Sequence, residues 1–138
     1  MIVIVCLDNN NGMMFNNRRQ SQDRILREHI LNLTKGSKLY MNSYSYKQFS
    51  NDAASQNIIV DENFLFKASK EDYCFVENMP LAEHIESIEK IIVYKWNRDY
   101  PSDFTLDITI DNEWKLTQTE EFKGSSHDKI TEEIYTND

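Results

Sequence analysis

Glycine is scarce in this chain, with three residues among 138, and they lie far apart at Gly12, Gly36 and Gly124. A backbone that approaches a phosphate closely needs neighbouring glycines in one turn, because only glycine lacks a Cβ atom. The spacing of the three residues therefore excludes a glycine-rich phosphate-binding loop of any class.

Cysteine is also scarce, and both residues, Cys6 and Cys74, lie inside apolar segments. This placement predicts buried free thiols in a reducing compartment. No apolar run is long enough to span a membrane. The apolar start, MIVIVCL, has no basic residues before it and is followed at once by Asp8, so it predicts a strand and not a secretion signal. We therefore expect a cytoplasmic protein without membrane contacts.

Charged residues are unevenly distributed along the chain, whose net charge is −8. Residues 1–50 contain seven Lys or Arg and three Asp or Glu, whereas the remaining 88 residues contain eight basic and twenty acidic groups. Such an asymmetry can steer a charged partner, although a solvated surface without a partner explains it equally simply.

The length and the 40% of apolar residues predict one folded domain, residues 1–138.

The order of apolar patterns predicts an α/β protein. Residues 1–7 form a continuous apolar run, as expected of a central strand that is covered on both faces. Residues 21–33 predict an amphipathic helix with Ser21 as its N-cap. Shorter helices are expected at residues 80–86 and, as a helix or turn, at 43–49. Further strands are expected at residues 38–41, 57–60, 73–76, 91–96, 105–110, 114–122 and 130–135, with 64–66 as a possible addition. Because the last three strands follow one another without a helix, they predict an antiparallel edge.

Segment by segment, the chain resembles the dihydrofolate reductase family. MIVIVCLDNNNG resembles the first strand and loop of that family, KLYMNSYSYKQF resembles its strand–turn–helix segment, and residues 73–96 follow its strand, turn, helix and strand without a gap. The resemblance lies in the order and spacing of the elements, and no motif is intact. It implies a mixed, mostly parallel central sheet flanked by helices, with an antiparallel C-terminal hairpin and a reduced nucleotide-binding region.

The ligand-binding residues of the family are largely replaced. Its phosphate-clamping Gly-Arg step and its Gly-Gly turn are both missing, and the corresponding positions, vestiges of a cofactor site, are Asn42, Ser43, Ser45, Glu77 and Asn78. Ala54-Ser55-Gln56 stands where an arginine would hold the folate carboxylate. The interval between Val60 and Tyr73 is too short for the elements that the family has there, so the structure of residues 61–72 stays open. We expect no cofactor, and NADPH only if a reductase activity survives.

Two acidic residues are candidates for special roles. Glu77 precedes the expected helix at residues 80–86, where a carboxylate complements the helix dipole, so we expect a structural anion in place of a phosphate. Asp23 corresponds to the pterin-binding carboxylate of the family and is a vestigial catalytic candidate. Arg27 lies four residues further on, which predicts an Asp23–Arg27 ion pair. No histidine spacing fits a metal site.

These departures favour a pseudoenzyme, a non-catalytic binding protein on a dihydrofolate reductase-like scaffold. The expected partner is another protein with an acidic face, and a phage or mobile-element accessory protein acting in the host cytoplasm would fit the reduced domain. Arginines and aromatic residues dominate interface energetics, so Tyr40, Tyr44 and Tyr46 would flank the partner surface. The residues expected to bind the partner are Met13, Met14, Phe15, Arg18, Arg19, Arg24 and Arg27.

Alternatives remain open at this point. A divergent NADPH-dependent dihydrofolate or pterin reductase would use Asp23 to handle a proton. A nucleic-acid binder would use the basic patch from Arg18 to Lys47, although the acidic remainder of the chain opposes it. The run from Met13 to Phe15 could instead pack into the vacant pocket. The sheet edge near residues 61–72 could pair with a second copy of the chain.

Overall fold

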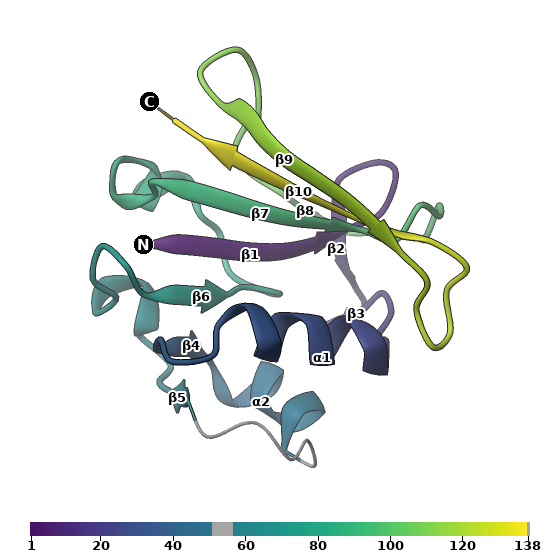
Figure 1. The fold of residues 1–138 in the computed structure, drawn as a ribbon, viewed down its shortest axis with the longest axis horizontal. Helices are drawn as coiled ribbons and strands as arrows, with labels where there is room; N and C mark the ends of the chain where they lie inside the picture. Colours follow the sequence, from purple (N-terminus) through teal and green to yellow (C-terminus); the bar gives the residue numbers. More distant parts are fainter. Residues whose placement is uncertain (51–56, 138) are drawn as a thin grey trace.

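A computed structural model describes residues 1–50 and 57–137, within which the chain forms a seven-stranded sheet and a three-stranded sheet (Figure 1). The large sheet comprises β1 (Ile2–Leu7), β4 (Leu39–Met41), β5 (Ile58–Val60), β6 (Tyr73–Phe75), β7 (Lys90–Lys95), β9 (Lys115–Phe122) and β10 (Ile130–Thr136). The small sheet comprises β2 (Gly12–Phe15), β3 (Arg18–Arg19) and β8 (Phe104–Thr105). The helices are α1 (Arg24–Leu33), α2 (Ser43–Phe49) and the 3-10 helices η1 (Phe64–Phe66) and η2 (Ala82–Ser87).

The strand order of the large sheet is β5-β4-β6-β1-β7-β10-β9. Neighbours from β5 to β7 are parallel, whereas β10 runs antiparallel to both β7 and β9. This arrangement confirms the predicted mixed, mostly parallel sheet with an antiparallel C-terminal hairpin. No helix in the described ranges is long and apolar enough to cross a membrane.

Strand β1 divides the interior into two cores. Its alternate residues point to opposite faces of the sheet, as strand geometry requires. Ile2 and Ile4 pack in the core that contains apolar side chains of α1 and α2, which lie on one side of the sheet (Figure 1). Val3 and Val5 pack in the other core, with side chains from β2, η1 and the segment before β9. Coverage on both faces explains why this strand reads as a continuous apolar run.

Asparagine takes several turn positions that usually belong to glycine. Asn11, Asn16, Asn17 and Asn97 all have positive φ angles, between 51° and 60°. Among residues with a Cβ atom, asparagine tolerates this left-handed region best, because its short side chain can hydrogen-bond locally. The chain can therefore build tight turns although it contains few glycines.

The start of α1 differs from the prediction. Its N-cap is Asp23, whose backbone is extended and whose Oδ1 accepts a hydrogen bond from the amide of Leu26 at 3.1 Å. Ser21, predicted as the cap, lies two residues too early for this bond. The end was predicted correctly at Leu33, and Gly36 adopts a φ of +84° shortly after it.

One other local prediction was largely wrong, and two can be made more specific. Residues 64–66, left open as a possible strand, form a 3-10 helix, and the short helix expected at residues 80–86 is confirmed as the 3-10 helix Ala82–Ser87. In the expected strand at residues 105–110, only Thr105 belongs to a β-ladder. The alternation beyond it is real, because Leu106, Ile108 and Ile110 pack against the core. An apolar alternation reports which side chains face inward and does not ensure a paired neighbour.

Both cysteines are free thiols, as expected. Burial raises the pKa of Cys74 to about 12. Burial is also the main cause that raises the pKa of Cys6, with a smaller contribution from Glu77. Thiols of this kind stay protonated and unreactive at neutral pH.

Strand β2 corrects part of the expected partner surface. Met13 and Met14 are only 5% and 3% exposed and belong to the core, whereas Phe15 is 39% exposed. The two methionines are therefore not available at a surface for a partner. They pack inward, which was the alternative considered for this run.

Replacement of Met14 by alanine is expected to reduce the free energy of unfolding by about 2–5 kcal/mol, because it leaves a cavity in a packed core. Phe15→Ala is the matched neighbour and should cost about 1 kcal/mol or less, because its ring is partly in solvent. Urea denaturation of both variants measures the difference. Equal losses would contradict the inward placement of Met14.

Candidate functional site

The Glu77 carboxylate, just after β6, is a buried junction between three segments. The side chain is 9% exposed and receives two hydrogen bonds from Arg19 of β3, from Nε at 2.9 Å and from Nη2 at 3.1 Å. The hydroxyl of Ser45 in α2 donates a third, at 2.8 Å. A bidentate guanidinium–carboxylate pair of this kind is among the strongest polar contacts in proteins.

Tyr44 holds the same arginine from the other side. The guanidinium carbon of Arg19 lies 4.5 Å from the centroid of the Tyr44 ring, and Nη2 donates to the Tyr44 carbonyl oxygen at 3.2 Å. The backbone amide of Arg19 donates to the Tyr44 hydroxyl at 2.8 Å. Burial lowers the pKa of Arg19, but the hydrogen bond and charge of Glu77 outweigh it and raise that pKa above its ordinary value. Arg19 is therefore a positively charged residue fixed within the structure.

The start of α2 is satisfied by side chains of the chain itself. Asn42 caps the helix, accepting from the amide of Ser45 at 3.0 Å, and its own amide donates to Oδ1 of Asn78 at 2.9 Å. The amide of Ser43 donates to Oε2 of Glu62 at 2.8 Å. Free amides at a helix start are what an anionic ligand would use. Here the side chains of Glu62 and Asn42 accept from the amides of Ser43 and Ser45. The Asn42–Asn78 hydrogen bond joins the turn before α2 to the turn after β6.

The helix η2 was expected to have Glu77 near its start, but another carboxylate serves it. Asp107 accepts from the amides of Leu81 and Ala82 at 2.8 and 3.0 Å. Glu77 does act as a structural anion, but through Arg19 and Ser45 near α2. The sequence gives no sign of Asp107, because it is 26 residues from Leu81 and belongs to a different segment.

Asp23 is enclosed by the loop that precedes β10. Its carboxylate accepts from the backbone amides of Ser125 and Ser126, at 3.0 and 2.9 Å, in addition to its bond with Leu26. Nδ1 of His127 lies 2.9 Å from Oδ2. Among the described residues the ion-pair partner of Asp23 is His127, so the predicted pair with Arg27 was wrong.

The geometry explains how Asp23 is held as a carboxylate. Burial alone would raise its pKa, but the hydrogen bonds from His127 and from the three backbone amides outweigh burial and lower the pKa well below its usual value of 3.8. Gly124 lies so close that a Cβ atom at this position would collide with the carboxylate. The Asp23 side chain has no exposed surface in this arrangement.

His127 continues this network toward the surface. Its Nε2 lies 3.0 Å from the Ser21 hydroxyl and 3.1 Å from the Tyr100 hydroxyl, and its ring stacks on Trp96 with centroids 4.5 Å apart. Nε2 is thus within hydrogen-bond distance of both hydroxyls, while Nδ1 faces Asp23. The order Ser21–His127–Asp23 has the connectivity of a catalytic triad. The Tyr100 hydroxyl shares Nε2, however, and the carboxylate is committed to capping α1, so the network joins the loop to the helix.

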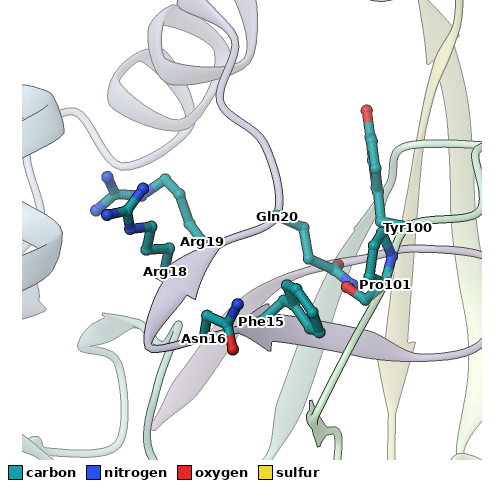
Figure 2. A pocket seen from close by; sticks show the side chains of 7 residues that line it. All are labelled: Phe15, Asn16, Arg18, Arg19, Gln20, Tyr100 and Pro101. Atoms are coloured by element: carbon teal, nitrogen blue, oxygen red, sulfur yellow. The ribbon is translucent and has the colours of Figure 1, made fainter.

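A pocket of about 460 Å³ opens beside the Arg19–Glu77 cluster and the Asp23–His127 network, and Arg19 and Tyr100 line it. Figure 2 shows Arg18 and Arg19 extending away from Tyr100 and Pro101, with Phe15 between the two groups. Arg18 is exposed, and its guanidinium makes no hydrogen bond or ion pair that the described part of the chain records. Among residues 1–50 and 57–137, the lining contains two arginines and no carboxylate, and it consists of Phe15, Asn16, Arg18, Arg19, Gln20, Tyr100 and Pro101.

The arginines expected to bind a partner therefore have different roles. Arg19 is bound to Glu77, and Arg24 forms an exposed ion pair with Glu28 at 2.8 Å. Arg27 donates to Oε1 of Gln22 at 3.3 Å. Arg18 alone of the four lines the pocket with an exposed side chain that is not engaged in this way. The triplet Ala54-Ser55-Gln56 lies outside the described residues.

Comparison with known proteins supports the fold. No protein-family model matches the chain. No curated protein sequence matches it either. Among solved structures, the chain is similar to dihydrofolate reductase from Enterococcus faecalis in complex with NADP(H) and RAB-propyl, with a TM-score of 0.68 over 99% of this chain and 95% of that one, at 8% sequence identity. The protein therefore has a dihydrofolate reductase-like fold, and an identity this low shows the fold alone.

Replacement of Asp23 by asparagine is expected to reduce the free energy of unfolding at pH 7 by about 1.5–3 kcal/mol, because the charge-assisted hydrogen bonds are lost. The pKa of Asp23 is lowered in the folded state, so its contribution is complete above the unfolded-state value and is lost as the pH falls below about 4. The difference between the wild type and the variant should therefore be smaller at pH 3 than at pH 7. Urea denaturation at pH 7, 5 and 3 measures this, with the exposed Glu86→Gln as control; a difference independent of pH would contradict it.

Proposed function

We propose that this protein is a non-catalytic binding protein on a dihydrofolate reductase-like scaffold, and that its pocket receives an acidic segment of a partner protein. The observation that carries the proposal is the Arg19–Glu77 pair with Ser45 and Tyr44. This cluster fills the region where the sequence resemblance implies a cofactor site. All five vestigial positions lie in or next to it.

A dinucleotide phosphate would meet negative charge at this place. Glu62 already accepts from the first amide of α2, and Glu77 lies 2.8 Å from the Ser45 hydroxyl. To bind the same donors, a phosphate would have to break the hydrogen bonds that these donors make to Glu62 and Glu77. It would also be repelled by both carboxylates. This arrangement supports a binding protein that uses no NADPH.

The position of Asp23 supports the same conclusion. A reductase needs a carboxylate that can contact its substrate and assist protonation. The Asp23 side chain has no exposed surface, and its oxygens already accept from Leu26, Ser125, Ser126 and His127. A pterin could reach it only if the loop that contains Ser125 and Ser126 moved away from α1.

The lining of the pocket indicates the chemistry of the partner. The chain as a whole carries a charge of −8, so an acidic molecule is repelled by most of its surface. At the pocket Arg18 offers an exposed side chain and Phe15 an exposed ring, and Gln20 lines it as well. This combination fits a carboxylate side chain followed by an apolar one. Arginines and aromatic rings of this kind are frequent anchors of protein interfaces.

Millimolar NADPH is expected to leave the melting temperature unchanged, because Arg19 and Glu77 occupy the required space. A ligand at about 100 times its dissociation constant would stabilise the protein by about 2.7 kcal/mol, which is several degrees for a domain of this size. Differential scanning fluorimetry with NADPH, and separately with a tight antifolate, provides the measurement. A clear shift with either compound would favour the reductase alternative.

The variant Arg18→Glu is expected to lose partner capture while keeping the wild-type melting temperature, because it reverses the exposed charge of the pocket. Lys38→Glu, an exposed residue before β4, makes the same charge change elsewhere and should capture the partner normally. Affinity purification from a cell lysate with all three proteins compares them. Retention of the partner by Arg18→Glu would show that the binding surface lies elsewhere.

A further inference from the structure

Two glutamates face each other across the C-terminal hairpin. Glu120 of β9 and Glu132 of β10 are direct partners in the antiparallel register. Side chains at such positions stand close together on one face of the sheet, and like charges directly opposite one another are destabilising. The pair therefore needs a compensating positive charge.

The neighbouring acidic residues in the same two strands are each paired with a lysine. Glu121 is 3.0 Å from Nζ of Lys129, and Glu133 is 3.0 Å from Nζ of Lys95. Within the described part of the chain, the ion pairs recorded for the opposed glutamates involve one imidazole and no lysine or arginine.

Glu132 is the more constrained of the two, because its side chain is only 2% exposed. Its Oε2 accepts from the Tyr94 hydroxyl at 2.8 Å. The Tyr94 side chain is itself fully buried, so this hydrogen bond is shielded from water. One neutral hydrogen bond compensates a buried carboxylate only in part.

The imidazole of His29 in α1 lies between the two carboxylates. Its Nε2 is 3.2 Å from Oε2 of Glu120, and its Nδ1 is 3.4 Å from Oε2 of Glu132 and 2.9 Å from the Tyr94 hydroxyl. The ring stacks flat on Phe122, with centroids 4.6 Å apart and planes 4° from parallel. The histidine is thereby oriented, and at 25% exposure it stays accessible from solvent.

We propose that His29, Glu120 and Glu132 bind a divalent transition-metal cation of the Zn²⁺ type, with the Tyr94 hydroxyl beside the site. One ligand atom from each of the three side chains lies within 4.8 Å of the others. Zinc–ligand bonds of about 2.0–2.2 Å require these atoms to move closer together. Glu120 can make that movement, because its side chain is 55% exposed and at the edge of the sheet.

The donor set matches the charge and chemistry of such a cation. One imidazole nitrogen and two carboxylates are ligands that zinc accepts, and two negative charges balance the metal charge. Water would complete the coordination on the exposed side of Glu120. The hydrogen bond from Tyr94 to Glu132 has the form of an outer contact that orients a ligating carboxylate. This site lies on α1, β9 and β10 and is independent of the proposed partner pocket.

Isothermal titration of the full-length, chelator-treated protein with ZnCl₂ tests the proposal, together with melting curves with and without the metal. Wild type is expected to bind one equivalent at this site and to melt at a higher temperature when zinc is present. Glu132→Gln and Glu120→Gln should each weaken this binding at least tenfold and remove the thermal shift. Glu121→Gln, the adjacent acid in β9, should bind zinc like the wild type.

Glu120 is largely exposed, so Glu120→Gln keeps the test informative even if a variant at the buried Glu132 failed to fold. Absence of zinc binding by the wild type would overturn the proposal. Unchanged zinc affinity in Glu120→Gln would also overturn it, because the metal would then be held elsewhere.

Discussion

The ion pair between Arg19 and Glu77 joins three parts of the chain that are distant in sequence. It connects β3, the turn after β6 and, through Ser45, the start of α2. Because both charged groups are largely removed from water, the pair is stable only when all of its hydrogen-bond partners are in place. The region around the pair is therefore filled by side chains of the chain itself, and the pocket lined by Arg18 and Phe15 opens beside it.

The same principle recurs in other parts of the structure. Glu62 accepts from the start of α2, Asp107 from the start of η2, and Asp23 from α1 and from the loop before β10. Each carboxylate takes backbone donors that are left over where a helix begins. Part of the acidic surplus of the chain is thus used inside the fold, in positions where a bound anion could otherwise be held.

Periodicity in the sequence was sufficient to predict most strands and α1, because apolar alternation and helical spacing are local properties. The mixed sheet followed from the order of these elements. The contacts of Asp23 and Glu77 could not be predicted, because their partners His127 and Arg19 are 104 and 58 residues away. The sequence offers Arg27 as the neighbour of Asp23, whereas in the fold the carboxylate contacts the loop that contains Ser126 and His127. Met13 and Met14 were misplaced for a related reason: the pattern shows an apolar run but not that both faces of β2 are covered at these two residues.

The position of β1 in the sheet has a consequence for biosynthesis. This strand hydrogen-bonds to residues 73–75 on one edge and to residues 90–95 on the other. During translation, an almost wholly apolar strand leaves the ribosome long before either neighbour exists. Pairing over such separations is slow, and an unpaired apolar strand is prone to associate with other chains. The nascent protein therefore passes through an interval in which its central strand must be kept apart from other polypeptides, and the yield of folded protein depends on how briefly that interval lasts.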